Sequence, residues 1–506
     1  MNLHILTVIA YPLILVGASY WLSRRIRNHD DFMVAGRATP VLLLVGSLVA
    51  TWIGSGSLFA GAGLAYRSGI SALWFSFGAW AGLIVAYFLA GRVRRIAQYT
   101  VPDLLEARYN AAARVLGTAA IILAYITIAA YQFRGGGWIL AITTDGAISP
   151  TVGMYLTAAT VVAFTALAGM TSIMRIDILN GIFISLGVLI ALPYMIASLG
   201  GVGPTLDALP AGHLTPLGDH NALWVLGISL PTFLLLLGDA GIYQKFFSAR
   251  DEGSARKAVL GMVVGVMLLE TALVTLAATG RAAFPGLESG TSIIGRAASE
   301  TVILHIARHG LPAVGGAILL AAGIAIVLST GNTFMIVSST NATRDIYQRF
   351  VNPDATEHQL LRLQRTAIVV FAAAAVLLLT QFETVLSMAL YAYSLIGASI
   401  TPVLLAAFLW KRVTPRGGLA CIAGGAGTIV ALAVLTRLGL DFTVTVGGTA
   451  FDLASSDYVV IPAVIVSVCL MVVVSLLTEP SPPEQWAPFF RKPEQETDPG
   501  PLDAGL

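Results

Sequence analysis

Charged residues are scarce in this chain of 506 residues: Asp, Glu, Lys and Arg together make up 11%, whereas soluble domains carry about 25%. The chain has only two cysteines, Cys421 and Cys469, and neither has the spacing of a metal ligand, which argues against a disulfide framework or a zinc site. The net charge of +2 gives no indication of nucleic-acid binding. We find no nucleophile–base set, so the sequence predicts no enzyme, no catalytic residue and no cofactor.

Hydrophobic residues, by contrast, make up 57% of the chain, and they gather in runs that can cross a bilayer, which takes about 20 residues each. The sequence therefore predicts an all-α, polytopic membrane protein with about 13 transmembrane helices. The expected spans are residues 4–23, 41–66, 70–91, 114–144, 151–168, 176–198, 222–247, 256–280, 311–340, 365–382, 385–410, 417–436 and 458–477.

The distribution of basic residues predicts the orientation in the membrane. Most of the 29 Lys and Arg residues fall in the loops that follow odd-numbered spans. Because cytoplasmic loops carry the excess of positive charge, we expect these loops in the cytoplasm. The protein is then a multi-pass component of the cell inner (plasma) membrane, with its N-terminus outside and its C-terminus cytoplasmic.

Two spans contain poor helix formers at mid-membrane depth. The run Gly54-Ser55-Gly56-Ser57 interrupts the second span, and Leu237-Gly238-Asp239-Ala240-Gly241 interrupts the seventh. Lipid cannot satisfy a broken backbone, so a break must face protein or a watery cavity. The alternative is a glycine-rich helix that packs closely against a neighbour. Counted from the second span, the breaks fall in the first and sixth of ten helices, a spacing that matches two five-span inverted repeats.

This pattern divides the chain into four parts. Residues 1–30 form a peripheral first helix and a cytoplasmic loop, residues 31–410 the inverted-repeat core, and residues 411–477 peripheral C-terminal helices. Residues 478–506 are rich in Pro, Glu and Asp, which predicts a disordered cytoplasmic tail.

Four motifs carry a family resemblance. They are Asp31-Phe32-Met33-Val34-Ala35-Gly36-Arg37, the run from Tyr99 to Tyr109, Ser329-Thr330 with Ser338-Ser339-Thr340, and Asp345-Ile346-Tyr347. Together with the first break, they resemble the sodium:solute symporter family, over about residues 30–410. The resemblance implies a LeuT-like fold and a secondary transporter that couples inward sodium flux to uptake of a small organic solute by alternating access. The expected partners are the solute, sodium ion and the lipid bilayer.

By resemblance, the sodium site is built from carbonyls at Ala50 and Ile53 and from carbonyl and hydroxyl oxygens at Ile326, Ser329 and Thr330. The chemistry agrees, because a hard cation prefers oxygen ligands. The competing interpretation is that Ser329 and Thr330 bond back to their own helix.

Asp177 looks like a family carboxylate near the cytoplasmic end of its helix, and we expect it on the sodium exit route. The alternatives are an ion pair with Arg175 or a juxtamembrane charge.

Arg134 lies within a span, where an arginine is costly unless paired, and its planar fork suits a carboxylate. In sialic-acid-transporting relatives an Arg in this span holds the substrate carboxylate, so the resemblance implies that Arg134 binds a carboxylate solute. The alternative is an internal ion pair with Asp239 or Glu270. We expect the remaining substrate-binding residues to be Trp52, Ser55, Ser57, Trp74 and Asp239.

Two other functions compete with a sodium symporter. The first is a membrane sensor on the same scaffold, against which the short segment after residue 478 argues. The second is a transporter coupled to protons rather than sodium, in which Asp177 or Glu270 titrates.

Overall fold

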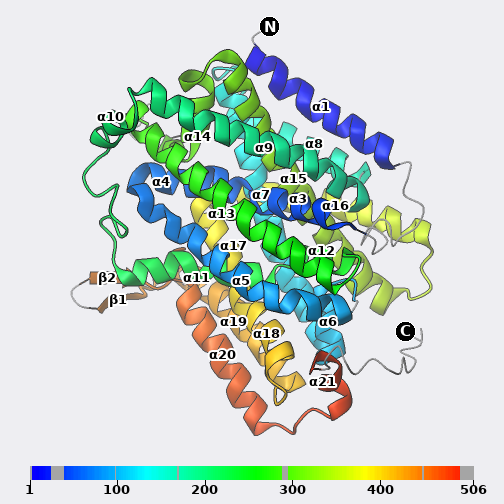
Figure 1. The fold of residues 1–506 in the computed structure, drawn as a ribbon. Coiled ribbons are helices and arrows are strands. Elements are labelled where there is room, and N and C mark those ends of the chain that lie inside the picture. Colours follow the sequence, from blue (N-terminus) through cyan, green and yellow to red (C-terminus); the bar gives the residue numbers. More distant parts are fainter. Residues whose placement is uncertain are drawn as a thin grey trace.

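The computed structural model describes residues 3–23, 39–96, 98–167, 170–287, 295–446 and 449–490. These residues are mostly helical, and their one sheet is an antiparallel hairpin, β1 (Thr443–Val446) paired with β2 (Thr449–Asp452) (Figure 1). Twelve of the described helical stretches are long and apolar enough to cross a membrane. The expectation of an all-α, polytopic membrane protein is confirmed.

The helices follow the predicted spans in order. They are α1 (Leu3–Ser23), α3 (Val41–Trp52), α4 (Ala62–Ser68), α5 (Leu73–Ile96), α6 (Val101–Arg108), α7 (Ala111–Thr143), α8 (Pro150–Leu167), α9 (Met170–Ser198), α10 (Val202–Asp207), α11 (Ala222–Gly238), α12 (Ala240–Ser248), α13 (Glu252–Ala283), α14 (Val302–His305), α15 (Ala313–Thr340), α16 (Glu357–Leu379), α17 (Val385–Ser399), α18 (Thr401–Leu409), α19 (Pro415–Arg437), α20 (Val460–Leu477) and α21 (Pro483–Phe490). The second and third expected spans are joined by a tight turn: α4 ends at Ser68, Gly69 has φ 64°, and the short turn Gly69–Ala72 leads into α5.

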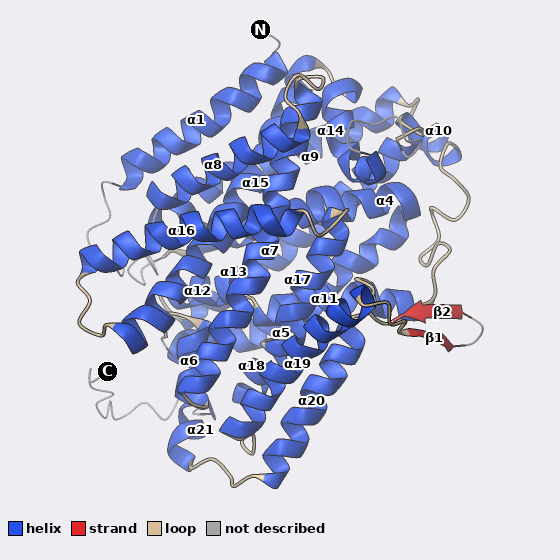
Figure 2. Ribbon diagram, turned by 180° about the vertical axis from the view of Figure 1, so that it is seen from behind, coloured by secondary structure: helices blue, strands red, loops and turns tan. Residues whose placement is uncertain are grey.

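The most buried helices form the centre of the molecule. Of the 18-residue apolar segment of each helix, 78% is buried in α15 and 83% in α17–α18, against 28% in α1 and in α20. A helix that is hydrophobic all round must be surrounded by other elements, and α15 indeed packs against α7, α9 and α1. Helices α1 and α20 lie at opposite edges in both views (Figures 1 and 2).

Loops predicted to share one side of the membrane contact one another. On the basic side, the Thr39 N–H donates to the Ser248 carbonyl (3.1 Å), Arg94 Nε donates to the Ala249 carbonyl (2.6 Å), and Arg108 reaches the Lys411 carbonyl (3.3 Å). On the other side, Arg67 donates to Ser299 (2.6 Å) and Arg308 pairs with Asp145 (2.7 Å). The predicted alternation of loops is therefore consistent with the fold, and which end faces the cytoplasm stays a prediction.

The expectation of a disordered tail from residue 478 is wrong in its first part. Residues Pro483–Phe490 form α21, and Phe489 is buried with its ring edge-on to Phe408, 5.6 Å between centroids. Apolar Trp486, Phe489 and Phe490 give this segment something to bury, which the Pro and Glu content concealed. Residues 491–506 and the Gly36-Arg37 motif lie outside the described residues.

Candidate ion and solute site

The first break lies where the sequence predicts it. Helix α3 ends at Trp52, and Ile53 has ψ 83°, which is not helical. The chain resumes as a π-helical turn, Gly56–Gly61, that leads into α4. An alanine at Gly56 would place its Cβ 2.4 Å from the Tyr393 hydroxyl, so glycine is required for this close approach. The alternative of a continuous helix is wrong.

The second break separates α11 from α12. Asp239 is extended between them (φ −69°, ψ 107°), and its carboxylate accepts the Ile242 N–H at 2.8 Å, as an N-cap does. Gly241 donates its N–H to the Tyr125 hydroxyl at 3.2 Å. Backbone groups freed by the break are thus satisfied by protein, as the interior of a membrane requires.

The hydroxyls of α15 face the first break. Ser329 Oγ lies 3.4 Å from the Ala50 carbonyl oxygen, and Thr330 Oγ1 donates to the Thr51 carbonyl (3.2 Å). Both side chains reach across to another helix, so the competing expectation that they bond back to α15 is wrong. Ala50, Ile53 and Ile326 are fully buried, and Ser329 and Thr330 nearly so. The structure therefore brings α3 and α15, which supply the five proposed sodium ligands, into contact.

Asp177 is joined directly to this group. Its carboxylate accepts from Ser329 Oγ and from Ser47 Oγ, each at 2.6 Å, and it is 1% exposed. Its basic neighbour is Lys245 of α12, with 3.7 Å between Nζ and Oδ2. The alternative pairing with Arg175 is therefore wrong.

Lys245 is a residue that the sequence analysis missed. Its ammonium is fully buried and donates to the Ser47 carbonyl (2.9 Å) and to the Thr51 hydroxyl. The sequence placed it at the cytoplasmic end of a span, where lysines are common. The available signal was its position six residues after Asp239, on the helix that follows the second break.

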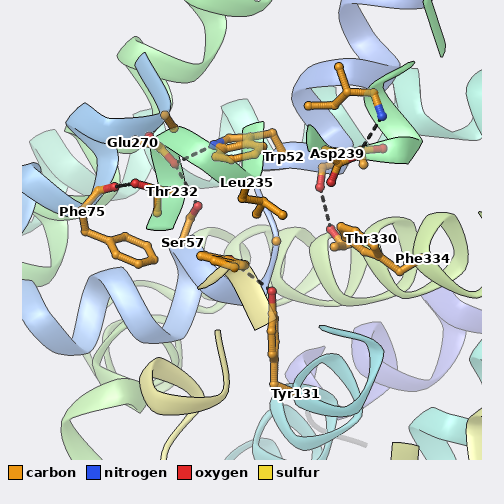
Figure 3. A pocket seen from close by; sticks show the side chains of 15 residues that line it. Trp52, Ser57, Phe75, Tyr131, Thr232, Leu235, Asp239, Glu270, Thr330 and Phe334 are labelled. Carbon is orange, nitrogen blue, oxygen red and sulfur yellow. Dashed lines mark hydrogen bonds between the residues drawn. The ribbon is translucent and has the colours of Figure 1, made fainter. Parts of the chain in front are cut away.

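A small cavity lies between the two breaks (Figure 3). Its volume is about 30 Å³, and a cavity that holds one water molecule needs roughly 10–15 Å³. It therefore has room for a few non-hydrogen atoms. Its walls come from both breaks and from α5, α7, α13, α15 and α17, and consist of Thr51, Trp52, Gly54, Ser57, Phe75, Ala79, Tyr131, Thr232, Leu235, Asp239, Ile242, Glu270, Thr330, Phe334 and Tyr393.

Three of the expected substrate residues, Trp52, Ser57 and Asp239, line this cavity, whereas Arg134, Ser55 and Trp74 do not. Arg134 donates to the Leu379 carbonyl (2.6 Å) and the Phe382 carbonyl (2.8 Å), at the C-terminal end of α16. Neither Asp239 nor Glu270 pairs with it in the described structure. Arg134 therefore binds the end of α16 in this structure, and its assignment to a solute carboxylate stays a prediction.

Ser55 and Trp74 have other partners. The Ser55 N–H donates to Gln132 Oε1 at 3.1 Å, which satisfies one backbone group of the break and gives the buried Gln132 a role that the sequence analysis missed. Trp74 Nε1 donates to the Pro216 carbonyl at 2.8 Å, in the loop before α11. Neither residue lines the cavity in this structure, and their contact with a solute stays a prediction.

Comparisons with known proteins agree with this geometry. A family model described as "Sodium:solute symporter family" matches residues 32–425. The chain is 26% identical over 450 residues to the sodium/proline symporter of Escherichia coli (strain K12), covering 86% of this chain and 88% of that protein. It is 24% identical over 462 residues to the sodium/pantothenate symporter of the same organism, covering 87% and 91%.

Solved structures share the fold. A Na+-coupled sialic acid symporter, in a substrate-bound outward-open state, matches with a TM-score of 0.72 and 15% identity, over 95% of this chain and 99% of that one. The nucleobase-cation-symport-1 family transporter Mhp1, in a closed conformation with bromovinylhydantoin bound, matches with a TM-score of 0.55 and 12% identity, over 89% and 95%. At these identities the likeness is one of fold.

Proposed function

Because the chain belongs to the sodium:solute symporter family, we propose that it couples inward sodium flux to the uptake of a small organic solute by alternating access. The observation that carries this proposal is the convergence of Ala50 and Thr51 carbonyls with Ser329 and Thr330 hydroxyls at the first break. The energy suffices, since sodium entry yields about 2.3 kcal/mol per charge per 100 mV, in addition to its concentration gradient.

In this proposal the sodium ligands are the oxygens of Ala50, Ile53, Ile326, Ser329 and Thr330. The Ser329 hydroxyl donates its proton to Asp177, so its lone pairs remain oriented for a cation. Asp177 supplies negative charge one hydroxyl away, and an ion leaving the site toward the cytoplasm meets it first. The solute binds in the adjacent cavity, so that ion and solute share the wall formed by Thr51 and Thr330.

The second candidate is proton coupling, and the observation that favours it is the Lys245 ammonium beside Asp177. A fixed cation at this place compensates the carboxylate without sodium. The two candidates differ in which gradient drives the solute.

Uptake into proteoliposomes separates them, with proline and pantothenate, the solutes named for two relatives, as labelled probes. We expect accumulation with a sodium gradient alone and none with a proton gradient alone. Accumulation with a proton gradient in sodium-free buffer contradicts sodium coupling. If neither probe is taken up, exchange of labelled sodium across the same membranes measures the ion site by itself, and its absence contradicts the proposal.

A further inference from the structure

Glu270, on α13, is a buried carboxylate in the cavity wall with neutral hydrogen-bond donors as its partners. It accepts from Trp52 Nε1 (3.1 Å) and Ser57 Oγ (3.1 Å) through one oxygen, and from Trp80 Nε1 (2.9 Å) through the other (Figure 3 shows the first two). It is 3% exposed. These donors hold the carboxylate in place and leave its negative charge without a compensating cation.

No ion pair compensates this charge in the described structure. The ion pairs of the described residues do not include Glu270, and the cavity lining contains no Lys, Arg or His. A charge at membrane depth is costly unless it is paired or faces a hydrated path that carries ions or solutes. A proton can neutralise Glu270 while the cavity is empty, and a cation that enters the cavity can take the place of that proton.

A second carboxylate faces the same space. Asp239 lines the cavity and accepts the Ile242 N–H, again a neutral donor. The Lys245 ammonium interacts with Asp239 electrostatically, but its hydrogen bonds go to Ser47 and Thr51, and Lys245 is not part of the lining. The cavity is thus acidic on the side formed by α13 and by the second break.

Aromatic side chains complete the wall. Trp52, Phe75, Tyr131, Phe334 and Tyr393 all contribute to the lining. Ring faces attract cations within about 6 Å of the ring centroid, and more strongly when the cation is desolvated. Carboxylates combined with aromatic rings are suited to an ammonium group and reject an anion.

We infer that the transported solute carries an ammonium group, which binds in this cavity against Glu270 and the surrounding rings. The inference rests on the proposed function, since it names the class of solute for the same cavity. It replaces the carboxylate that the sequence predicted from Arg134. In this structure the cavity has room for the ammonium end of the solute, a few non-hydrogen atoms in size.

Binding to the purified full-length protein in sodium-containing buffer tests the inference. The probes are methylammonium, ethanolamine and choline as cations, 3,3-dimethylbutan-1-ol as the uncharged carbon isostere of choline, and propionate as an anion. Quenching of tryptophan fluorescence is a suitable signal, because Trp52 and Trp80 both donate to Glu270. We expect at least one ammonium probe to bind, and the neutral isostere and propionate to bind at least tenfold more weakly.

Variants assign the binding to the cavity. Glu270→Gln keeps the shape and removes the charge, and we expect it to weaken ammonium binding at least tenfold. Asp239→Asn is a second variant, because asparagine caps a helix as well as aspartate does; we expect a smaller loss. The matched control is Glu300→Gln, since Glu300 is also buried but accepts from the Val385 and Leu386 N–H groups, outside the cavity. It should bind as wild type does.

The outcomes distinguish a failure of the inferred solute class from a failure of sodium coupling. If no ammonium probe binds, or if Glu270→Gln binds it as wild type does, the inference is overturned. If sodium alone stabilises wild type but not Glu270→Gln, the compensating cation is an inorganic ion, and the inference again fails. Sodium-independent uptake of a probe that requires Glu270 would overturn sodium coupling while the solute class stands.

Discussion

At the scale of single residues, the site depends on buried polar groups whose partners come from distant parts of the chain. Ser329 was predicted as a ligand from its place in a motif, and the structure places it against Ala50. Lys245 and Gln132 could not be assigned, because nothing local shows that their side chains reach Ser47 or Ser55. The depth of a polar residue is readable from sequence, whereas its partner depends on tertiary packing.

Replacing Lys245 by Met tests the pairing with Asp177. The variant keeps the length of the side chain but leaves a buried carboxylate without its cation, which costs about 3–5 kcal/mol. We expect a large drop in the thermal unfolding temperature in sodium-free buffer. The double variant Lys245→Met with Asp177→Asn should recover part of the loss. Strictly additive losses in the two single variants would contradict an interaction between these groups.

Replacing Arg134 by Ala tests whether it serves the end of α16 or the solute. The variant removes two hydrogen bonds from a charged donor to carbonyls at the end of α16, each worth about 1.5–3 kcal/mol. We expect a lower unfolding temperature, with the affinity for ethanolamine, measured by fluorescence, unchanged. A selective loss of solute affinity in a variant of normal stability would return Arg134 to the solute site.

At the scale of elements, both helix breaks were predictable because Gly, Ser and Asp at mid-membrane leave few alternatives. Their geometry was not: the π-helical turn after the first break depends on Gly56 lying against Tyr393. Helix α21 was missed because a short amphipathic segment gains its order from α18, through Phe408. Local composition thus gives the position of an interruption, and neighbouring helices decide its form.

Close packing of α5 on α11 gives a prediction at this scale. A Cβ at Gly78 would lie 2.0 Å from the Ser229 carbonyl oxygen, so Gly78→Ala must push the helices apart. We expect a loss of about 1–3 kcal/mol, as in other overpacked interiors, seen as a lower unfolding temperature. Gly427→Ala is the control, because its Cβ would meet nothing within 4 Å. An equal effect of the two substitutions would refute the close approach.

An ion-pair network joins α6, α7 and the π-helical segment Asn341–Val351 that follows α15. Arg114 bonds Asp103, Glu106 and Asp345 at 2.5–2.6 Å, and Arg349 bonds Glu106 at 2.8 Å. The family motifs at residues 99–109 and 345–347, far apart in sequence, therefore meet in one network. This gives a physical reason for both motifs.

This network predicts a pH dependence. Burial raises the pKa of the Glu106 carboxyl, but the hydrogen bonds from Arg114 and Arg349 outweigh it, so the net pKa is lowered. A lowered folded pKa gives stability that is fully present above the ordinary value of about 4.3 and is lost as pH falls through the folded value. Thermal unfolding of wild type and Glu106→Gln across pH should differ at neutral pH and converge in acid. A constant difference would contradict the ionic contribution of Glu106.

At the scale of the whole molecule, the fold class and the two interruptions followed from the distribution of apolar, small and basic residues, and the family from the resemblance of four motifs. The solute class did not, since it depends on α13 bringing Glu270 to a cavity whose other walls come from six further segments. The proposed transport cycle requires that the ion and solute sites act together, and they share Thr51 and Thr330 at their boundary. We therefore expect binding of one to affect binding of the other through this boundary.

Sodium binding to the purified protein, measured as the rise in unfolding temperature with sodium against potassium in the absence of solute, tests the central claim most directly. The account predicts that sodium stabilises the wild-type protein. It predicts a sodium affinity at least tenfold weaker in Ser329→Ala, which corresponds to about 1.4 kcal/mol. Ser338→Ala should behave as wild type does, because the Ser338 hydroxyl bonds back to Phe334 on the same helix. Equal stabilisation of all three proteins by sodium, or none in wild type, would contradict it.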